Sequence, residues 1–251
     1  MKHLSLAFFI SLASLSAFAN CADVAAIPSH LDPSDLEKCV VSSERIAVVD
    51  NSTGRYGFVN TAGEVVIPPT LEQAWSFQEG LAVVKKDGKW GHIRPDGTFA
   101  VPAIYDDAWG FSDGLAKVEK AKKAGFVNQK GEIVIPIKYD ETEHWFNEQR
   151  AAVSINNKWG LIDSSGRLLT KLDFDSMSMP SEGLILASKL TPNNEIRYGY
   201  LNTDGKTAIA FDYDLASNFS RGTATVIKDG ENYYINRYGE QVELKESYLN
   251  F

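Results

Sequence analysis

Residues 81–102 read LAVVKKDGKWGHIRPDGTFAVP. Asp87-Gly88 separates two short runs rich in β-branched and aromatic residues, and a third run follows Asp96-Gly97. An Asp-Gly pair between such runs is typical of a tight hairpin turn, because glycine adopts a positive φ without a steric clash. The stretch therefore predicts three antiparallel strands. Pro102 ends the third strand, where the sheet needs no further N–H donor.

The same pattern recurs through most of the chain. Its marker is a glycine that follows an aromatic residue in four of five units and Ala124 in the other, and these glycines fall at positions 57, 91, 125, 160 and 199, in steps of 34, 34, 35 and 39. Recurrence at such a spacing is the signature of a repeat architecture. Degenerate units at residues 45–50 and 232–239 are typical of capping repeats. The marker positions are Tyr56, Gly57, Trp90, Gly91, Gly125, Trp159, Gly160, Tyr198 and Gly199.

One unit cannot bury its apolar residues alone, so neighbouring units must stack. We expect an all-β fold of tandem three-stranded meander repeats, each about 34 residues long and followed by an irregular excursion. The preferred arrangement is an open solenoid. The alternative is a closed propeller-like ring, although propeller blades usually have four strands and about 40–45 residues. The repeat domain is predicted to span residues 43–243, with a C-terminal tail at 244–251.

These motifs resemble the bacterial WG-repeat family, also described as WG β-repeats or KWG-type repeats. The resemblance covers about residues 43–243, and several positions recur in phase. Tryptophan is kept only at Trp90 and Trp159, whereas tyrosine or alanine replaces it elsewhere. The resemblance implies an exported or surface-associated repeat scaffold and no established chemistry.

The N-terminus has the pattern of a secretory signal. Lys2 and His3 precede an apolar stretch that ends in Ala17-Phe18-Ala19, so residues 1–19 are predicted to be a signal peptide cleaved after Ala19. The protein is then periplasmic or secreted. A retained anchor and a lipoprotein are the alternatives, but the cleavage box disfavours the first and Asn20, next to Cys21, disfavours the second.

The N-terminal segment, residues 20–42, contains both cysteines of the chain. Two cysteines in an exported protein indicate one disulfide, here between Cys21 and Cys39. It would close a loop around residues 31–38, where Asp32 and Pro33 predict the start of a helical turn. A catalytic thiol is the alternative, but neither cysteine lies in a local signature with histidine.

The composition excludes several functions. The formal net charge is −8, which disfavours nucleic acid as a partner. No apolar window of 18 residues follows the signal, so we expect no membrane span. His30, His92 and His144 show no metal-ligand spacing, and we expect neither metal nor cofactor. Gly110 to Gly114 matches the G-x-S-x-G hydrolase motif around Ser112, but this is the repeat's own Phe-x-x-Gly segment.

Three tryptophans outside the marker positions are candidate ligand contacts. Trp75 and Trp109 are in phase, and Trp145 is displaced by one residue. Core positions tolerate such displacement poorly, so these three side chains are predicted to form an exposed aromatic surface, with core packing as the alternative. Trp90 and Trp159 are expected to pack in the interior.

Two series of charged residues also keep the repeat spacing. Every basic residue precedes an acid by 17 residues, which predicts that at least two of these pairs come within salt-bridge reach. The acids are also expected to accept backbone N–H bonds in turns, rather than to bind calcium. The pairs are Arg55 and Glu72, Lys89 and Asp106, Lys123 and Asp140, Lys158 and Asp175, and Arg197 and Asp214.

The sequence carries no reaction signature, so an enzyme is the least favoured function. We expect a non-enzymatic scaffold that binds a protein partner in the cell envelope, similar to an inhibitor or an immunity protein. The alternative is a module that binds glycan or cell wall through Trp75, Trp109 and Trp145.

Overall fold

The computed structural model describes residues 27–33 and 44–243. Strands and turns make up these two ranges, and the all-β prediction is confirmed. The predicted signal peptide, the Cys21–Cys39 disulfide and the tail at 244–251 lie outside the described residues. They stay predictions.

The strands form six small antiparallel sheets, numbered I to VI along the chain. Sheet I contains β1 (Leu31–Pro33), β2 (Arg45–Asp50), β3 (Tyr56–Asn60) and β4 (Val65–Leu71); sheet II contains β5 (Gln73–Ala74), β6 (Ala82–Lys86), β7 (Lys89–Ile93) and β8 (Phe99–Tyr105). Sheet III contains β9 (Asp107–Ala108), β10 (Leu115–Lys120), β11 (Lys123–Asn128) and β12 (Ile133–Tyr139); sheet IV contains β13 (Glu141–Thr142), β14 (Arg150–Ile155) and β15 (Lys158–Asp163). Sheet V contains β16 (Ser176–Met177), β17 (Leu184–Leu190), β18 (Ile196–Asn202) and β19 (Thr207–Tyr213); sheet VI contains β20 (Leu215–Ala216), β21 (Thr223–Lys228), β22 (Glu231–Asn236) and β23 (Gln241–Val242).

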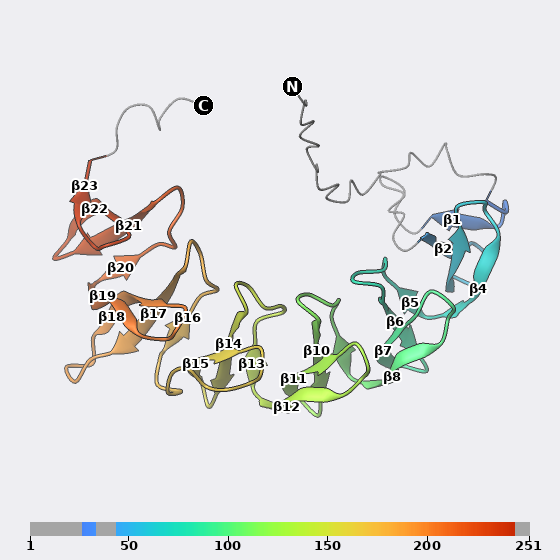
Figure 1. Cartoon of the computed structure of the whole chain (residues 1–251), viewed down its shortest axis with the longest axis horizontal. Coiled ribbons are helices and arrows are strands. Elements are labelled where there is room, and N and C mark those ends of the chain that lie inside the picture. Colours follow the sequence, from blue (N-terminus) through green and yellow to red (C-terminus); the bar gives the residue numbers. More distant parts are fainter. Residues whose placement is uncertain (1–26, 34–43, 244–251) are drawn as a thin grey trace, which may run out of the picture.

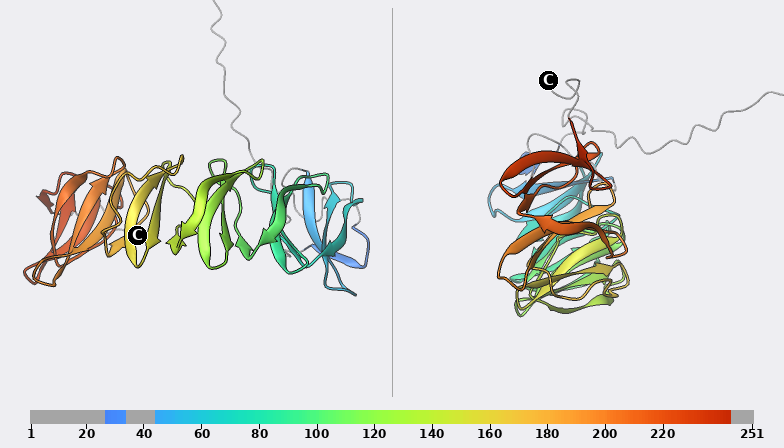
Figure 2. Two further views of the ribbon diagram at one scale, coloured as in Figure 1. Left: turned by 90° about the horizontal axis from the view of Figure 1, so that it is seen from below. Right: turned by 90° about the vertical axis from the view of Figure 1, so that its left-hand side faces the viewer.

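The sheets follow one another along an arc (Figure 1). In sheet II, for example, the short strand β5 lies toward the concave side, whereas the last strands β8 and β12 lie on the convex side. Figure 2 shows the sheets side by side along the length of the molecule. Within the described residues, no strand of sheet I pairs with a strand of sheet VI.

Two predictions about the unit were wrong. Most sheets have four strands rather than three, and Pro102 lies inside β8 instead of ending the strand. The additional strand is a two-residue segment inside the predicted irregular excursion. β8 ends at Tyr105 and β9 begins at Asp107, so the chain passes from one sheet to the next across a single residue, Asp106. β9 then pairs with β10 through Ala108 and Val118. Two residues are too few to produce a visible alternation in the sequence.

The predicted start of a helical turn at Asp32 and Pro33 was also wrong, and residues 34–38 of that turn lie outside the described residues. Leu31–Pro33 forms strand β1, which pairs with β2 in the register Leu31 to Asp50. Leu31 packs with Ile46 and Val48 in a buried cluster. Burial of this leucine on a sheet edge outweighs the local preference of Asp-Pro for a helix start.

The tight turns agree with the sequence. Asp87 and Gly88, between β6 and β7, have φ values of 51° and 74°. Two positive φ values in a two-residue loop match the right-handed twist of the flanking strands. Ala121 and Lys122 adopt the same conformation without glycine, at 53° and 60°. The hairpin geometry therefore follows from the sheet, and glycine only makes it less strained.

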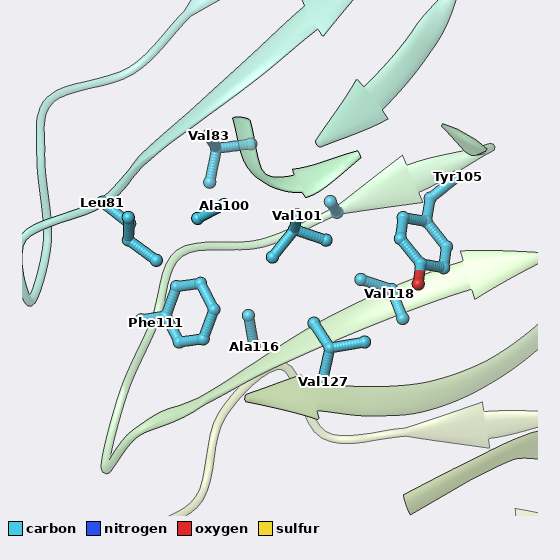
Figure 3. Packing of buried hydrophobic residues seen from close by; sticks show 10 residues of the cluster. Leu81, Val83, Ala100, Val101, Tyr105, Phe111, Ala116, Val118 and Val127 are labelled. Carbon is cyan, nitrogen blue, oxygen red and sulfur yellow. The ribbon is translucent and has the colours of Figure 1, made fainter. Parts of the chain in front are cut away.

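The core is divided into clusters that lie between consecutive sheets. Figure 3 shows the cluster in which Val83 and Val101 of sheet II pack against Val118 and Val127 of sheet III. Equivalent clusters fill the other four interfaces between neighbouring sheets. Each sheet is thus stabilised mainly by its neighbours, as stacked repeats require.

The marker glycine is required for a steric reason. Gly91 has an ordinary φ, but a Cβ placed on it would lie 2.6 Å from the carbonyl oxygen of Val101 and 2.7 Å from the backbone nitrogen of Ala103. The backbone of the outer strand therefore crosses directly over this position. Gly57 and Gly125 have equally close backbone neighbours.

Candidate functional site

In sheets II to VI, the segments that join the first two strands rise toward the concave side of the arc (Figure 1). Each contains a tight turn with two positive φ values, such as Glu79-Gly80 and Asp113-Gly114. Consecutive sheets place these turns side by side, since Glu79 accepts a hydrogen bond from the N–H of Gly114 at 2.9 Å. The concave side therefore presents one row of similar loops. Residues 75–81, 109–114, 143–149, 178–183 and 217–222 form them.

The three candidate tryptophans lie in the first three of these loops, in different environments. Trp75 is 65% exposed and Trp145 is 51% exposed, whereas Trp109 is half-buried. Trp109 donates its backbone N–H to Lys117, and Glu143 makes the equivalent bond to Ala152. Glu143 thus takes the position of Trp109. Trp145 lies further along a connection that is one residue longer than in the preceding sheet.

Sheets III and IV bring together Trp109, Lys117, His144 and Trp145, which we name the aromatic–lysine cluster. The rings of Trp109 and His144 are stacked, with centroids 5.1 Å apart and an interplanar angle of 29°. His144 also contacts Trp145, with ring centroids 5.8 Å apart. The Nζ of Lys117 lies 4.2 Å from the centroid of the Trp109 ring, a cation–π geometry. Trp109 therefore supports the exposed His144 and Trp145.

Lys117 is unusual because lysine is rarely buried, yet it is 5% exposed. Its Nζ donates to the carbonyl oxygen of Thr142 at 3.3 Å and lies 3.1 Å from Oε1 of Glu119. The neighbouring Glu143 is also partly buried, and this burial raises the pKa of its carboxyl group. The corresponding residues of the adjacent sheets are Val83 and Ala152, so this charged group does not recur with the repeat.

His92 lies behind Trp109. Its ring is fully buried, and Nε2 donates to the carbonyl oxygen of Trp109 at 2.7 Å. Phe58 and Phe126 take this position in the neighbouring sheets, so His92 is a core aromatic residue with one polar contact. Nδ1 has no hydrogen-bond partner among the described residues. Burial lowers the pKa of His92 to about 4, against an ordinary value of 6.5.

The predicted pairing of the two charge series is confirmed in all five units. The Nζ atoms of the lysines lie 2.5–2.6 Å from their aspartate partners, and Arg55 lies 3.7 Å from Glu72. Arg197 pairs with Asp214 in the same way. The hydrogen bond from Lys89 is the main cause that lowers the pKa of Asp106.

Each acid of this series also accepts a backbone hydrogen bond from the following sheet. Asp106 is the single residue between sheets II and III. One of its carboxylate oxygens pairs with Lys89 of sheet II. The other accepts a hydrogen bond from the N–H of Ala121, in the β10–β11 turn of sheet III, at 2.7 Å. Asp140 makes the corresponding bond to Asn156 at 2.8 Å. Glu72, Asp175 and Asp214 repeat the arrangement. The acids therefore accept backbone N–H bonds as predicted, but in the turn of the following sheet.

A second series of acids was not predicted from the sequence. These residues occupy the first position of the concave turns. Glu79, Glu148 and Glu182 accept the N–H groups of Gly114, Gly183 and Gly222 respectively, at 2.9, 3.2 and 2.9 Å. The signal was present in the sequence, because an acid precedes the glycine of the Phe-x-x-Gly segment at Gly80 and Gly114, and also precedes the equivalent Gly183.

The remaining candidate residues have structural surroundings. Trp90 and Trp159 are half-buried and pack against two of the cores between sheets. Ser112 lies beside a tight turn, where it pairs with Leu115 in an isolated bridge. The described part of the chain contains no group of three His, Cys, Asp or Glu residues able to hold a metal ion. In the same residues, no helix is long and apolar enough to cross a membrane.

Fold and site together define a tandem β-repeat protein with a loop-lined concave face. The model of the WG containing repeat matches residues 56–90, 90–123, 125–159, 159–189 and 198–231. The chain therefore belongs to the WG containing repeat family, and the resemblance inferred from the sequence is confirmed. A search of curated protein sequences found no match.

Several solved structures are similar in fold at low sequence identity. One is a eukaryotic initiation factor, with 14% identity and a TM-score of 0.49 over 80% of this chain. This chain spans 62% of the length of that structure. The WD40 domain of Toxoplasma gondii coronin matches with 11% identity and a TM-score of 0.35, over 79% of this chain and 67% of that one. The AfRom2 CNH domain matches with 9% identity and a TM-score of 0.36, over 85% of this chain and 82% of that one.

Proposed function

We propose that this protein is an exported, non-enzymatic scaffold whose concave face binds a protein partner in the cell envelope, in the manner of an inhibitor or immunity protein. The observation that carries the proposal is the aromatic–lysine cluster. It departs from the repeat pattern near the middle of the array and lies on the side where the loops gather.

The composition of the cluster favours a protein partner. Residues that dominate protein–protein binding are enriched in tryptophan and lie at the centre of an interface, where surrounding contacts exclude water. Trp145 supplies an exposed anchor, and Trp109 and Lys117 hold His144 beside it. The turn acids Glu79 and Glu148 lie in neighbouring loops and provide a polar rim.

An open array supports this use of the concave face. In an open solenoid, both ends of the arc stay apart and a folded domain can enter between them. In a closed ring, the same loops would face a narrow channel. We therefore retain the open form, together with export to the periplasm or beyond, as parts of the proposal.

Site-specific photo-crosslinking in the native host tests the proposal. A photoreactive amino acid replaces Trp145 on the concave side, and a matched control replaces Ile133, which is 56% exposed on β12 at the convex side. We expect Trp145 to capture a defined envelope protein that Ile133 does not capture. Identical products at both positions, or no product at Trp145, would refute a concave protein-binding site.

The alternative is a glycan or cell-wall ligand, favoured by the exposed indoles of Trp75 and Trp145. Sugar rings stack on exposed aromatic faces, and these two side chains are accessible without rearrangement. Retention of the purified protein on peptidoglycan, lost in the double variant Trp75→Ala with Trp145→Ala, would favour this alternative. Trp109 is a poor choice for this test, because its replacement would also disturb Lys117.

A further inference from the structure

The outer edges of the sheets differ in how they are protected from pairing with another strand. A free edge exposes backbone N–H and C=O groups, and proline blocks pairing because it has no N–H. β4, β8 and β12 carry Pro68, Pro102 and Pro136, each directly after the residue that pairs with the central strand. Three of the outer strands are thus protected in the same way.

β19 lacks this protection. It has seven residues, it is the last strand of sheet V, and its sequence TAIAFDY contains no proline. Ile209 pairs with Tyr200, so Ala210 stands where the other outer strands have proline. Sheet IV has only isolated bridges on this side, and β23 has two residues. Among the described strands, β19 is therefore the one long outer edge without a proline.

The geometry leaves the N–H of Ala210 available to an added strand. The equivalent prolines have no N–H, so the sheet does not depend on a donor at this position. Ala208 and Ala210 are both exposed, and their methyl groups are too small to obstruct an approaching backbone. Ile209, between them, is buried and fixes the register.

A pocket of about 370 Å³ adjoins the same strand. Phe211 and Asp212 of β19 form part of it, as do Lys228 at the end of β21 and Asp229 in the turn that follows. Lys228 lies 4.0 Å from Asp212, at the limit of an ion pair. Groups of both signs therefore face a space large enough for one polar side chain.

We propose that the outer edge of β19 binds an extended peptide segment of a partner protein as an additional strand, with one polar side chain in the adjacent pocket. Main-chain hydrogen bonds along an edge give affinity, and a side-chain pocket beside the edge gives specificity. A second copy of this chain is the less suitable occupant. Two β19 edges paired with each other bury far less than the roughly 1,000 Å² of a stable interface between two folded copies, whereas a peptide can also place a side chain in the adjacent pocket. This site is separate from the aromatic–lysine cluster.

A peptide selection tests the proposal. A random heptapeptide library is selected on the full-chain protein with the Ala210→Pro variant in excess as competitor, and the enriched peptide is synthesised. Ala210→Pro reproduces the residue of three other sheets, so it is expected to fold, which circular dichroism verifies. We expect it to weaken peptide binding at least about tenfold, the loss expected from a removed hydrogen bond and a steric block.

Two controls separate this result from other effects. Pro102→Ala changes an outer strand without touching β19 and should leave the affinity unchanged. Trp145→Ala should also leave it unchanged, so failure of this proposal and failure of the concave site are distinguishable. Equal peptide binding by wild type and Ala210→Pro, or no enriched peptide, would overturn the proposal. A dimer that Ala210→Pro dissociates, with no peptide selected, would assign the edge to a second copy and overturn the peptide as occupant.

Discussion

Protonation of His92 is expected to destabilise the protein in mild acid. The ring is buried, its Nε2–H already donates to the carbonyl of Trp109, and a second proton would have to enter at Nδ1, which has no partner among the described residues. The pKa therefore falls from 6.5 in the unfolded chain to about 4 in the folded protein. Because the unfolded state binds the proton more tightly, stability is complete above pH 6.5 and is lost as the pH falls toward 4.

The magnitude follows from the same shift. One pKa unit corresponds to about 1.4 kcal/mol, so the whole window is worth about 3 kcal/mol, of which about 2.5 kcal/mol is lost at pH 4.5. His92→Phe removes this proton site and places at the position the residue that Phe58 and Phe126 already provide. The variant loses the bond to Trp109, at a cost of about 1 kcal/mol that does not depend on pH.

Urea unfolding followed by circular dichroism, at pH 7.5 and pH 4.5, measures the difference. Wild type should lose about 2.5 kcal/mol more than His92→Phe between the two pH values. If the sheets unfold separately, amide hydrogen exchange within β7 (Lys89–Ile93) measures the stability of the sheet that contains His92. Parallel pH profiles for the two proteins would refute the reasoning, because carboxyl groups would then account for the whole acid sensitivity.

Three further substitutions test other parts of the structure. Gly91→Ala should destabilise the protein by about 3 kcal/mol in urea unfolding, because its methyl group would collide with the backbone at Val101; a loss below about 1 kcal/mol would contradict this. Asp140→Ala should accelerate amide exchange at Asn156, whose N–H it binds, and unchanged exchange would argue against the joint between sheets. Trp145→Ala should change the free energy of unfolding by less than about 0.5 kcal/mol, since the side chain is largely exposed; a larger loss would indicate a packing role.

The repeat spacing predicted much of the local structure. Asp87-Gly88 and its equivalents indicated the hairpins, and the constant offset of 17 residues indicated the ion pairs, because both depend on residues that recur in one register. The second partner of Asp106, the N–H of Ala121, was not predictable in this way. It belongs to the following sheet, and how sheets are placed relative to one another depends on packing that no short pattern encodes.

The candidate site was predicted less completely. The displacement of Trp145 correctly suggested an unusual position, and the structure places this side chain in a longer connection. Lys117 was overlooked, because a single lysine in a strand is normally read as a solvent-exposed residue. Its burial results from contacts with Trp109 and Thr142 that come from different elements. A buried lysine of this kind can be recognised only once the packing of the neighbouring sheet is known.

The single-residue passage between sheets determines how such a protein can evolve. Each passage uses one acid with the same two partners, so excision of residues 107–140 would join Asp106 directly to Glu141 and leave a complete passage behind. Loss or duplication of a gene segment that encodes one sheet therefore leaves the same kind of junction between the remaining sheets. Unequal recombination between such gene segments shortens or lengthens the array, and each new junction still contains one acid with the same two kinds of partner. Array length is thus free to vary among descendants, while the joint itself stays under selection.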